Sequence, residues 1–497
     1  MSTPTGLAGE MPRPIKVVMM GAGSSFTNAI LKDIVLIPGN QGGALHLVDI
    51  DERRLALAEK LMRVILKEAG QEGKWRLSMA TDRRKALEGA DYIVNSIEVA
   101  GLACVRPDND IPLQFGVSQN IGDTIGPGGL MKALRTVPVW LDILRDAEAL
   151  CPEALVLNYT NPMNIMCLAA QRTSKMHVVG LCHSVQGTSR MLARYAGIEY
   201  ERMEWKCAGI NHLAWFTELR GEESPLPLNL PPHEQAIMDR RRRDLYPDLM
   251  EQAKDPESEF RKAEPVRCDM MLHFGAFITE SSGHLSEYLP YYRKRPDLLK
   301  KYTDTGYRGE ESFYANNWPT WRANQDAYRE KLLGGEEKVD MTRTLEYGAW
   351  IIEAIEKNQP YFIHGNVPNA GITEGEGITV LGCYGVTRES EPQHRNTATP
   401  LIPNLPHDGC VEVACLVDKN GVQPQPFGPL PKQMAVICDS NMRMFDIAAD
   451  ACIERSKDLA IQALMLDPLT AAVCCPAEIT EMAEKLFEAE ASFLPGY

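Results

Sequence analysis

A cysteine and two histidines follow apolar segments in the middle of the chain. Residues 178–181 lead directly into Cys182 and His183, and a later apolar segment contains Asn211 and His212. A thiolate and a neutral imidazole from separate elements can bind a divalent transition metal. Two protein ligands leave positions on the metal open, as catalysis requires. A buried cysteine and a hydrogen-bonded core histidine are the alternative interpretation.

A second group of residues, near the start of the chain, has the spacing of a dinucleotide-binding turn. Residues 15–20 form a short apolar run typical of a buried strand, and Gly21 and Gly23 follow it. A helix-compatible segment and another strand come next, and that strand ends at Asp49. Gly21 permits a tight turn, Gly23 lets backbone approach a pyrophosphate, and Asp49 favours NAD because a carboxylate repels the 2′-phosphate of NADP. Phe26 replaces the third glycine of the usual pattern, so a plain turn between strand and helix is the alternative.

Polar residues follow three further strand-like runs, each at the end of its run. These runs lie at residues 91–97, 154–157 and 177–181. Because ligands bind at the carboxyl ends of strands in an open α/β sheet, we expect the polar residues to form one site. The predicted NAD-binding residues are Gly21, Gly23, Ser24, Asp49, Asn95, Glu98 and Asn158.

A loop rich in glycine, residues 120–130, separates two of these runs. Four glycines and a proline in this window exclude a regular element throughout it. Such a loop either lets backbone approach a ligand or leads into a helix. Asp123 within it and Arg106 before it are candidates for binding a substrate, although a solvated surface charge is the alternative for Arg106.

The composition limits the classes of function. The chain has 497 residues, 44% hydrophobic and 24% charged, with a formal net charge of −15. These values are typical of a globular protein, and the negative charge argues against nucleic acid or an anionic membrane as a partner. No apolar run approaches the roughly 20 residues of a membrane span. The thirteen scattered cysteines indicate reduced thiols in a cytoplasm.

Six motifs together resemble the NAD- and divalent-metal-dependent glycoside hydrolases of family 4. The motifs are Gly21-Ala22-Gly23-Ser24, Gly126-Pro127-Gly128-Gly129, Thr160-Asn161-Pro162, Cys182-His183-Ser184-Val185, Asn211-His212 and Asn404-Leu405-Pro406. They span nearly the whole chain in order. The Cys-His-Ser-Val motif resembles the α-galactosidase branch, which takes unphosphorylated sugars. NAD-dependent members of this family are exceptions to hydrolysis by two carboxylates.

The resemblance implies redox-assisted elimination with NAD and Mn²⁺ or a similar metal. NAD⁺ would take hydride from C3 of the sugar, a base would remove the C2 proton, and the glycosidic oxygen would leave before water adds and hydride returns. Cys182 and His212 would be the metal ligands, and Asn161 would hold the sugar. His183 is our candidate for acid assistance, with an orienting histidine outside the reaction as the alternative.

The base that removes the C2 proton is expected within residues 279–288, which contain hydroxyls, acids, a histidine and a tyrosine. His284 is our first candidate and Tyr288 the second. A hydrogen-bonded core histidine is the competing interpretation for His284.

The expected fold class is α/β. We predict a flexible extension at 1–14, a Rossmann-type NAD-binding domain with a parallel sheet at 15–185, and an α+β substrate-binding and oligomerisation domain at 186–497, as in lactate and malate dehydrogenases. Compared with the family, residues 373–402 are an insertion that could cap the site or an interface. We expect a homodimer or homotetramer. A 2-hydroxy-acid dehydrogenase of the same fold and a non-catalytic NAD-binding sensor are the alternative functions.

Overall fold

One mixed sheet runs through the protein. This computed structural model describes residues 6–221, 242–370 and 400–497, and within them thirteen strands form a single sheet. The main path of the sheet has the order β10-β8-β7-β12-β11-β6-β5-β4-β1-β2-β3, with β13 paired to β12 and β9 to β8. The two halves of this sheet have different strand directions and different origins in the sequence.

The first half of the chain forms the parallel part of the sheet. All its neighbouring strands pair in parallel, in the order β3-β2-β1-β4-β5-β6. This is the strand order of a Rossmann fold, in which ligands bind outside the carboxyl ends of the strands. The predicted Rossmann-type sheet is therefore confirmed. Its strands are β1 (Ile15–Met20), β2 (Gly43–Val48), β3 (Trp75–Ala80), β4 (Tyr92–Asn95), β5 (Leu155–Asn158) and β6 (His177–Leu181).

Helices connect these strands and cover the sheet. Asp51 caps α2, since its side chain accepts a hydrogen bond from Arg54 N. The glycine-rich loop ends as a helix leader, because α5 begins at Gly126 and Pro127 lies in its first turn, where a missing N–H costs nothing. The helices are α1 (Phe26–Val35), α2 (Glu52–Glu68), α3 (Arg83–Leu87), α4 (Leu102–Gln114), α5 (Gly126–Leu150), α6 (Met163–Thr173) and α7 (Ser184–Tyr195).

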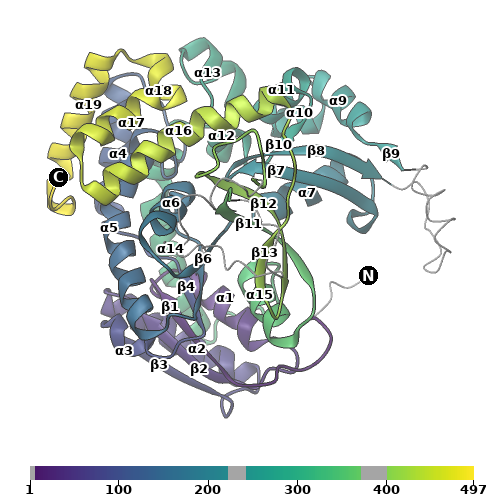
Figure 1. Ribbon diagram of the computed structural model, residues 1–497, viewed down its shortest axis with the longest axis vertical. Coiled ribbons are helices and arrows are strands. Elements are labelled where there is room, and N and C mark those ends of the chain that lie inside the picture. Colours follow the sequence, from purple (N-terminus) through teal and green to yellow (C-terminus); the bar gives the residue numbers. More distant parts are fainter. Residues whose placement is uncertain (1–5, 222–241, 371–399) are drawn as a thin grey trace, which may run out of the picture.

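The second half of the chain continues the sheet with antiparallel strands. The junction is the pairing of β11 with β6, where Gly365 lies opposite Leu181. Beyond this junction the sheet continues through β12 to the hairpin of β7 and β8, at the upper right of Figure 1. The strands are β7 (Met203–Ile210), β8 (Leu213–Gly221), β9 (Arg243–Asp244), β10 (Phe277–Ile278), β11 (Tyr361–Pro368), β12 (Cys410–Asp418) and β13 (Gly421–Pro424).

The remaining helices contact both parts of the fold, and the last four form the yellow group beside α4 and α5 (Figure 1). Together with the strands they complete the predicted α+β part of the fold. These elements are η1 (Tyr200–Arg202), α9 (Tyr246–Lys254), α10 (Glu259–Ala263), α11 (Pro265–Phe274), α12 (Ser282–Leu285), α13 (Pro296–Tyr302), η2 (Gly306–Arg308), α14 (Phe313–Gly334), α15 (Tyr347–Lys357), α16 (Lys432–Glu454), α17 (Lys457–Leu466), α18 (Pro468–Val473), α19 (Pro476–Ala489) and η4 (Ala491–Phe493).

Part of the predicted flexible extension is anchored to the fold. Leu7 N donates to Glu353 at 2.8 Å, and Met11 is buried. Arg13 pairs with Asp91 and Glu356. Residues 7–13 are therefore held by contacts that the composition of the segment did not indicate.

Three further sequence predictions concern the insertion, the cysteines and membrane-spanning segments. Residues 371–399 of the predicted insertion lie outside the described part of the chain. Among the cysteines that the structure describes, none forms a disulfide bond. Within the same residues, every helix is too short or too polar to cross a membrane.

Candidate active site

The predicted dinucleotide turn lies between β1 and α1. Gly21 has φ +76°, and a Cβ added there would lie 2.5 Å from the carbonyl oxygen of Ser96, so only glycine fits. Gly23 N donates to Asp49 Oδ2 at 2.7 Å. A Cβ on Gly23 would approach Asp49 Oδ2 to 2.9 Å. The turn and the acidic residue that follows β2 are thus in direct contact, and the role of Asp49 toward the ribose of NAD stays a prediction.

Two arginines that the sequence analysis did not single out fix the carbonyl side of this turn. Arg54 donates to Gly23 O from Nε and Nη2, at 3.0 and 2.8 Å. Arg329, from α14, donates to Gly23 O at 3.0 Å and also to Ser24 O. Burial, and then the charge of Arg54, lower the pKa of Arg329 to about 10. A helix of the second half of the chain therefore helps to shape the predicted cofactor site.

Two of the predicted NAD-binding side chains are hydrogen-bonded to each other. Asn95 Nδ2 donates to Asn158 Oδ1 at 2.8 Å, and both residues are fully buried at the ends of β4 and β5. Asn95 Nδ2 also lies 3.2 Å from Thr160 Oγ1. These contacts hold the ends of β4 and β5 together, and the contact of the two residues with NAD stays a prediction.

The predicted metal ligands come from both halves of the sheet. Cys182 follows β6 directly, and its Sγ lies 3.3 Å from Ser184 Oγ. His212 lies in the turn between β7 and β8 with φ +64°, and Glu280 has φ +72°. His212 Nε2 is 3.4 Å from Glu280 Oε2. His212 and Glu280 are therefore two non-glycine residues in contact that both have positive φ. Such a backbone conformation costs about 1–3 kcal/mol for each residue and is typical of active sites.

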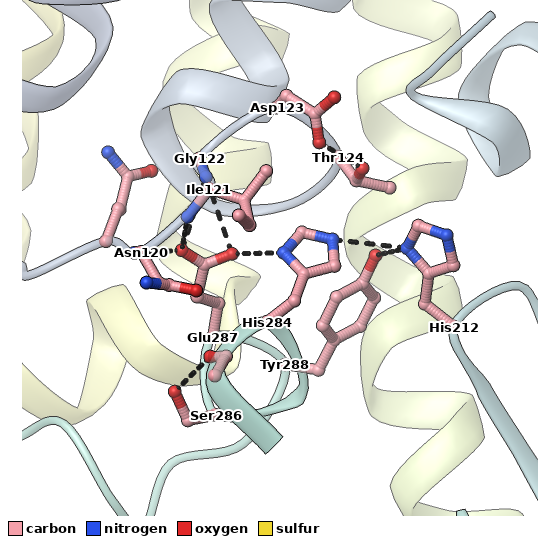
Figure 2. A network of polar contacts seen from close by, with 12 residues as sticks. Asn120, Ile121, Gly122, Asp123, Thr124, His212, His284, Ser286, Glu287 and Tyr288 are labelled. Atoms are coloured by element: carbon pink, nitrogen blue, oxygen red, sulfur yellow. Dashed lines mark hydrogen bonds and ion pairs between the residues drawn. The ribbon is translucent and has the colours of Figure 1, made fainter. Parts of the chain in front are cut away.

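The other nitrogen of His212 faces a buried network (Figure 2). His212 Nδ1 lies 3.1 Å from the hydroxyl of Tyr288 and 3.1 Å from His284 Nε2. His284 Nδ1 contacts Glu287 Oε2 at 2.6 Å. Glu287 in turn accepts from the backbone N–H of Ile121 at 2.8 Å, so the glycine-rich loop supports this network. With Nδ1 held by the network, Nε2 is the nitrogen of His212 available to a metal.

Opposite charges alternate along the adjacent part of the site. Lys132 Nζ lies 2.8 Å from Glu98 Oε2 and 3.4 Å from Asp123 Oδ2. Burial alone would lower the pKa of Lys132, but Glu98 and Asp123 outweigh it and raise that pKa. Burial alone would raise the pKa of Asp123, but Lys132, then His284, outweigh it and hold the pKa at about 2. Glu98 and Asp123 are both predicted site residues, and the lysine between them was not predicted.

The charges around the two candidate metal ligands also act on one another. Burial, opposed by His183 and reinforced by Glu280, raises the pKa of the Cys182 thiol. Burial, and then the charge of Cys182, raise the pKa of Glu412 well above its usual range. Glu412 lies on β12, is fully buried, and neither carboxylate oxygen has a hydrogen-bond partner among the described residues. This residue was not predicted from the sequence.

His183, Arg106 and Asn161 are more exposed than the buried histidine network. His183 Nδ1 is 3.3 Å from Glu346 Oε1, and this hydrogen bond is the main reason why the pKa of His183 is raised to about 9. The His183 side chain is 67% exposed. Arg106 pairs with Asp110 at 3.6 Å on the surface of α4, and Asn161 precedes Pro162 through a cis peptide bond at the end of β5.

These donors fit the cofactors that the sequence suggests. Within residues 6–221, 242–370 and 400–497, no three His, Cys, Asp or Glu side chains are grouped around one possible metal position. The candidate ligands Cys182 and His212 nevertheless supply a thiol and an imidazole nitrogen, which suit a divalent transition ion. The backbone of Gly21 and Gly23, beside the start of α1, suits a pyrophosphate.

The parallel sheet and its dinucleotide turn define an α/β protein of Rossmann type, with a candidate site at the carboxyl ends of the strands. Histidines from the antiparallel second half of the chain complete this site. Residues 16–198 match the profile of the family 4 glycosyl hydrolases. Residues 207–375 and 386–470 match the C-terminal domain of the same family. The chain belongs to family 4 of the glycosyl hydrolases.

Relatives and a solved structure agree with this assignment. An α-galactosidase of Bacillus subtilis (strain 168) is 33% identical over 97% of this chain and 99% of its own length. An α-galactosidase of Rhizobium meliloti (strain 1021) is 33% identical over 97% of this chain and 89% of its own length. A 6-phospho-α-glucosidase from gut microorganisms, solved in complex with NAD and Mn²⁺, has a TM-score of 0.73 and 20% identity, covering 97% of this chain and 99% of that one. Family membership favours a glycosidase over the dehydrogenase and the sensor.

Proposed function

We propose that this protein is an NAD- and divalent-metal-dependent α-galactosidase that acts on unphosphorylated sugars. The observation that carries the proposal is the convergence of a thiol, an imidazole and a phenol on the sheet edge that also holds the dinucleotide turn. Two relatives at 33% identity are α-galactosidases, and the Cys182-His183-Ser184-Val185 motif fits that branch.

The turn at Gly21 and Gly23, with Asp49, would hold NAD, and Cys182 with His212 would hold Mn²⁺ or a similar ion. When bound, the dinucleotide would accept and return a hydride at C3 of the sugar, while the ion would polarise the oxygens on C2 and C3 as a Lewis acid. The chain itself must then position the sugar, remove the C2 proton and protonate the leaving oxygen. Asn161 is our candidate for positioning the sugar.

Among the two candidate bases, the geometry favours Tyr288. Both ring nitrogens of His284 are engaged, one by Glu287 at 2.6 Å and the other by His212 at 3.1 Å. The oxygen of Tyr288 keeps a lone pair beside its contact with His212. Burial, and then the charge of Glu280, raise the pKa of Tyr288 well above its usual range, so the phenolate needs a cation in the site. We therefore reverse the order expected from sequence and assign His284 to holding His212.

We assign acid assistance to His183, because it is exposed at the start of α7 and held by Glu346. We expect His183→Ala to lower kcat/KM for alkyl α-galactosides by about 10²-fold, since general acids contribute roughly 10²–10⁴-fold. Nitrophenyl α-galactoside should lose much less, because nitrophenolate leaves without a proton. The check is a comparison of the two kcat/KM ratios in the variant. Equal losses for both substrates would contradict acid assistance and leave an orienting role.

The function is tested by hydrolysis of nitrophenyl α-galactoside with and without NAD⁺, Mn²⁺ and a thiol reductant. We expect turnover only when all three are present, with no net formation of NADH, because the hydride returns to the sugar. Net NADH from a 2-hydroxy acid would favour the dehydrogenase. Binding of NAD without turnover of any glycoside would favour the sensor.

We also propose that the protein works as a homodimer or homotetramer in the cytoplasm. The location rests on the absence of disulfide bonds among the described cysteines and on a thiol as candidate metal ligand, which an oxidising compartment would convert.

A further inference from the structure

Five aromatic side chains gather where η2 meets the start of α14. Tyr307 stacks on Trp321, with ring centroids 5.9 Å apart and planes at 12°. Phe313 packs edge-on against Tyr307 at 4.8 Å, and Tyr314 stacks on Trp318 at 4.9 Å. Tyr307 is 57% exposed, which is unusual for the top ring of a stack and leaves one face available.

This aromatic group is joined to the candidate active site through its backbone. Gly283 packs so closely against Tyr307 O that an added Cβ would lie 2.1 Å from it, and Gly283 immediately precedes His284. Asn120 Nδ2 donates to Gly306 O at 3.1 Å, and Tyr314 N donates to Asn120 O at 3.0 Å. The loop that supports Glu287 therefore also fixes the aromatic rings.

The electrostatic contacts agree with this position. Burial, and then the negative charges of Glu280 and Asp123, raise the pKa of Tyr307. Burial raises the pKa of Tyr314 too, with Lys132 opposing and Asp123 reinforcing it. Both tyrosines therefore lie within reach of charges from the centre of the site, while Tyr307 also reaches solvent.

Packing in the hydrophobic core does not explain the Tyr307 ring, because this ring is exposed. The charged side chains near it do not suit a purely apolar partner. Asp304, Arg308 and Glu310 are exposed around Tyr307. A sugar ring matches both features, because its C–H groups form an apolar face while its hydroxyls suit a polar rim.

We propose that Tyr307, supported by Trp321, is a binding platform for the sugar ring of the leaving group. This inference rests on the proposed function and narrows it: the substrates are α-galactosides in which galactose is linked to a second, neutral sugar. The galactose would occupy the centre beside His212, and the second ring would lie on the exposed face of Tyr307.

The test compares methyl α-galactoside with a disaccharide in which galactose is α-linked to O6 of glucose. In Tyr307→Ala we expect KM for the disaccharide to rise about tenfold, equivalent to about 1.4 kcal/mol. KM for methyl α-galactoside should change much less, because a methyl group does not reach the platform. Tyr307→Phe keeps the ring face and should restore the disaccharide KM. As a control, Tyr328→Ala removes a tyrosine of α14 that is 47% exposed, and it should not separate the two substrates.

Each remaining outcome is decisive. If the wild-type protein cleaves both substrates but Tyr307→Ala changes their KM values equally, the platform is wrong while the proposed function stands. If Tyr307→Ala changes the oligomeric state in size-exclusion chromatography without separating the substrates, the rings form a subunit contact and the platform is also wrong. If the wild-type protein cleaves no α-galactoside, the proposed function itself fails.

Discussion

Cys182→Ser and His212→Ala should each reduce kcat/KM for α-galactosides by about 10³-fold or more. A Lewis-acid metal contributes several kcal/mol to the transition state, and each 1.36 kcal/mol is tenfold in rate. Cys182 follows β6 and is only half-buried, so the smaller hydroxyl of serine leaves no large cavity. Loss of bound Mn²⁺, measured by atomic absorption after dialysis, should accompany the loss of activity.

Matched variants separate metal loss from general damage. Cys475→Ser changes an exposed thiol that caps α19, far from the candidate ligands in sequence, and should keep full activity. Mild oxidation should inactivate the wild-type protein, and a thiol with added Mn²⁺ should restore it. The circular dichroism spectrum of Cys182→Ser should match that of the wild type. Full activity of Cys182→Ser in the presence of a chelator would exclude this thiol as a metal ligand.

The parallel half of the fold could be predicted from sequence because its signals are local. Residues 15–20, 91–97, 154–157 and 177–181 are apolar runs, and the structure places β1, β4, β5 and β6 within or next to them. The rule that strand ends meet at one edge then located Cys182. His212 belonged to a different half of the chain, so its place beside this edge depended on the family resemblance, not on a local pattern.

The rest of the site could not be predicted, because burial and pairing depend on distant segments. The alternation in Val411-Glu412-Val413 is typical of a strand with one face in water, yet β12 lies inside the sheet between β11 and β7, and Glu412 is fully buried. Lys132 is on a helix face that only the fold brings between Glu98 and Asp123.

The base that removes the C2 proton also could not be identified from the sequence. From sequence, His284 is the first candidate for the base and Tyr288 the second. The hydrogen bonds made by the His284 and Tyr288 side chains decide which of them can act as the base. Glu287 lies three residues after His284 and is hydrogen-bonded to Nδ1 of that histidine. Its carboxylate also accepts a hydrogen bond from the backbone N–H of Ile121. No pattern within residues 279–288 indicates this contact with a loop from the first half of the chain.

Tyr288→Phe should lower kcat by about 10²–10⁴-fold, the usual contribution of a general base. The base removes the C2 proton while the electron pair of that C–H bond forms the C1–C2 double bond and the glycosidic oxygen departs. Without the phenolic oxygen this step has no acceptor for the proton. The substitution removes a single oxygen, and His212 Nδ1 keeps its contact with His284 at 3.1 Å, so metal content should be unchanged.

Isotopes distinguish this step from hydrolysis by two carboxylates, which leaves C2–H intact. Wild-type turnover in D₂O should place deuterium at C2 of the released galactose, and substrate deuterated at C2 should react more slowly. In Tyr288→Phe the incorporation of deuterium and the release of sugar should fall together. His284→Asn should differ, because it loosens His212 and should lower the bound Mn²⁺ as well as the rate. If Tyr288→Phe kept wild-type kcat and wild-type deuterium incorporation, Tyr288 would not be the base.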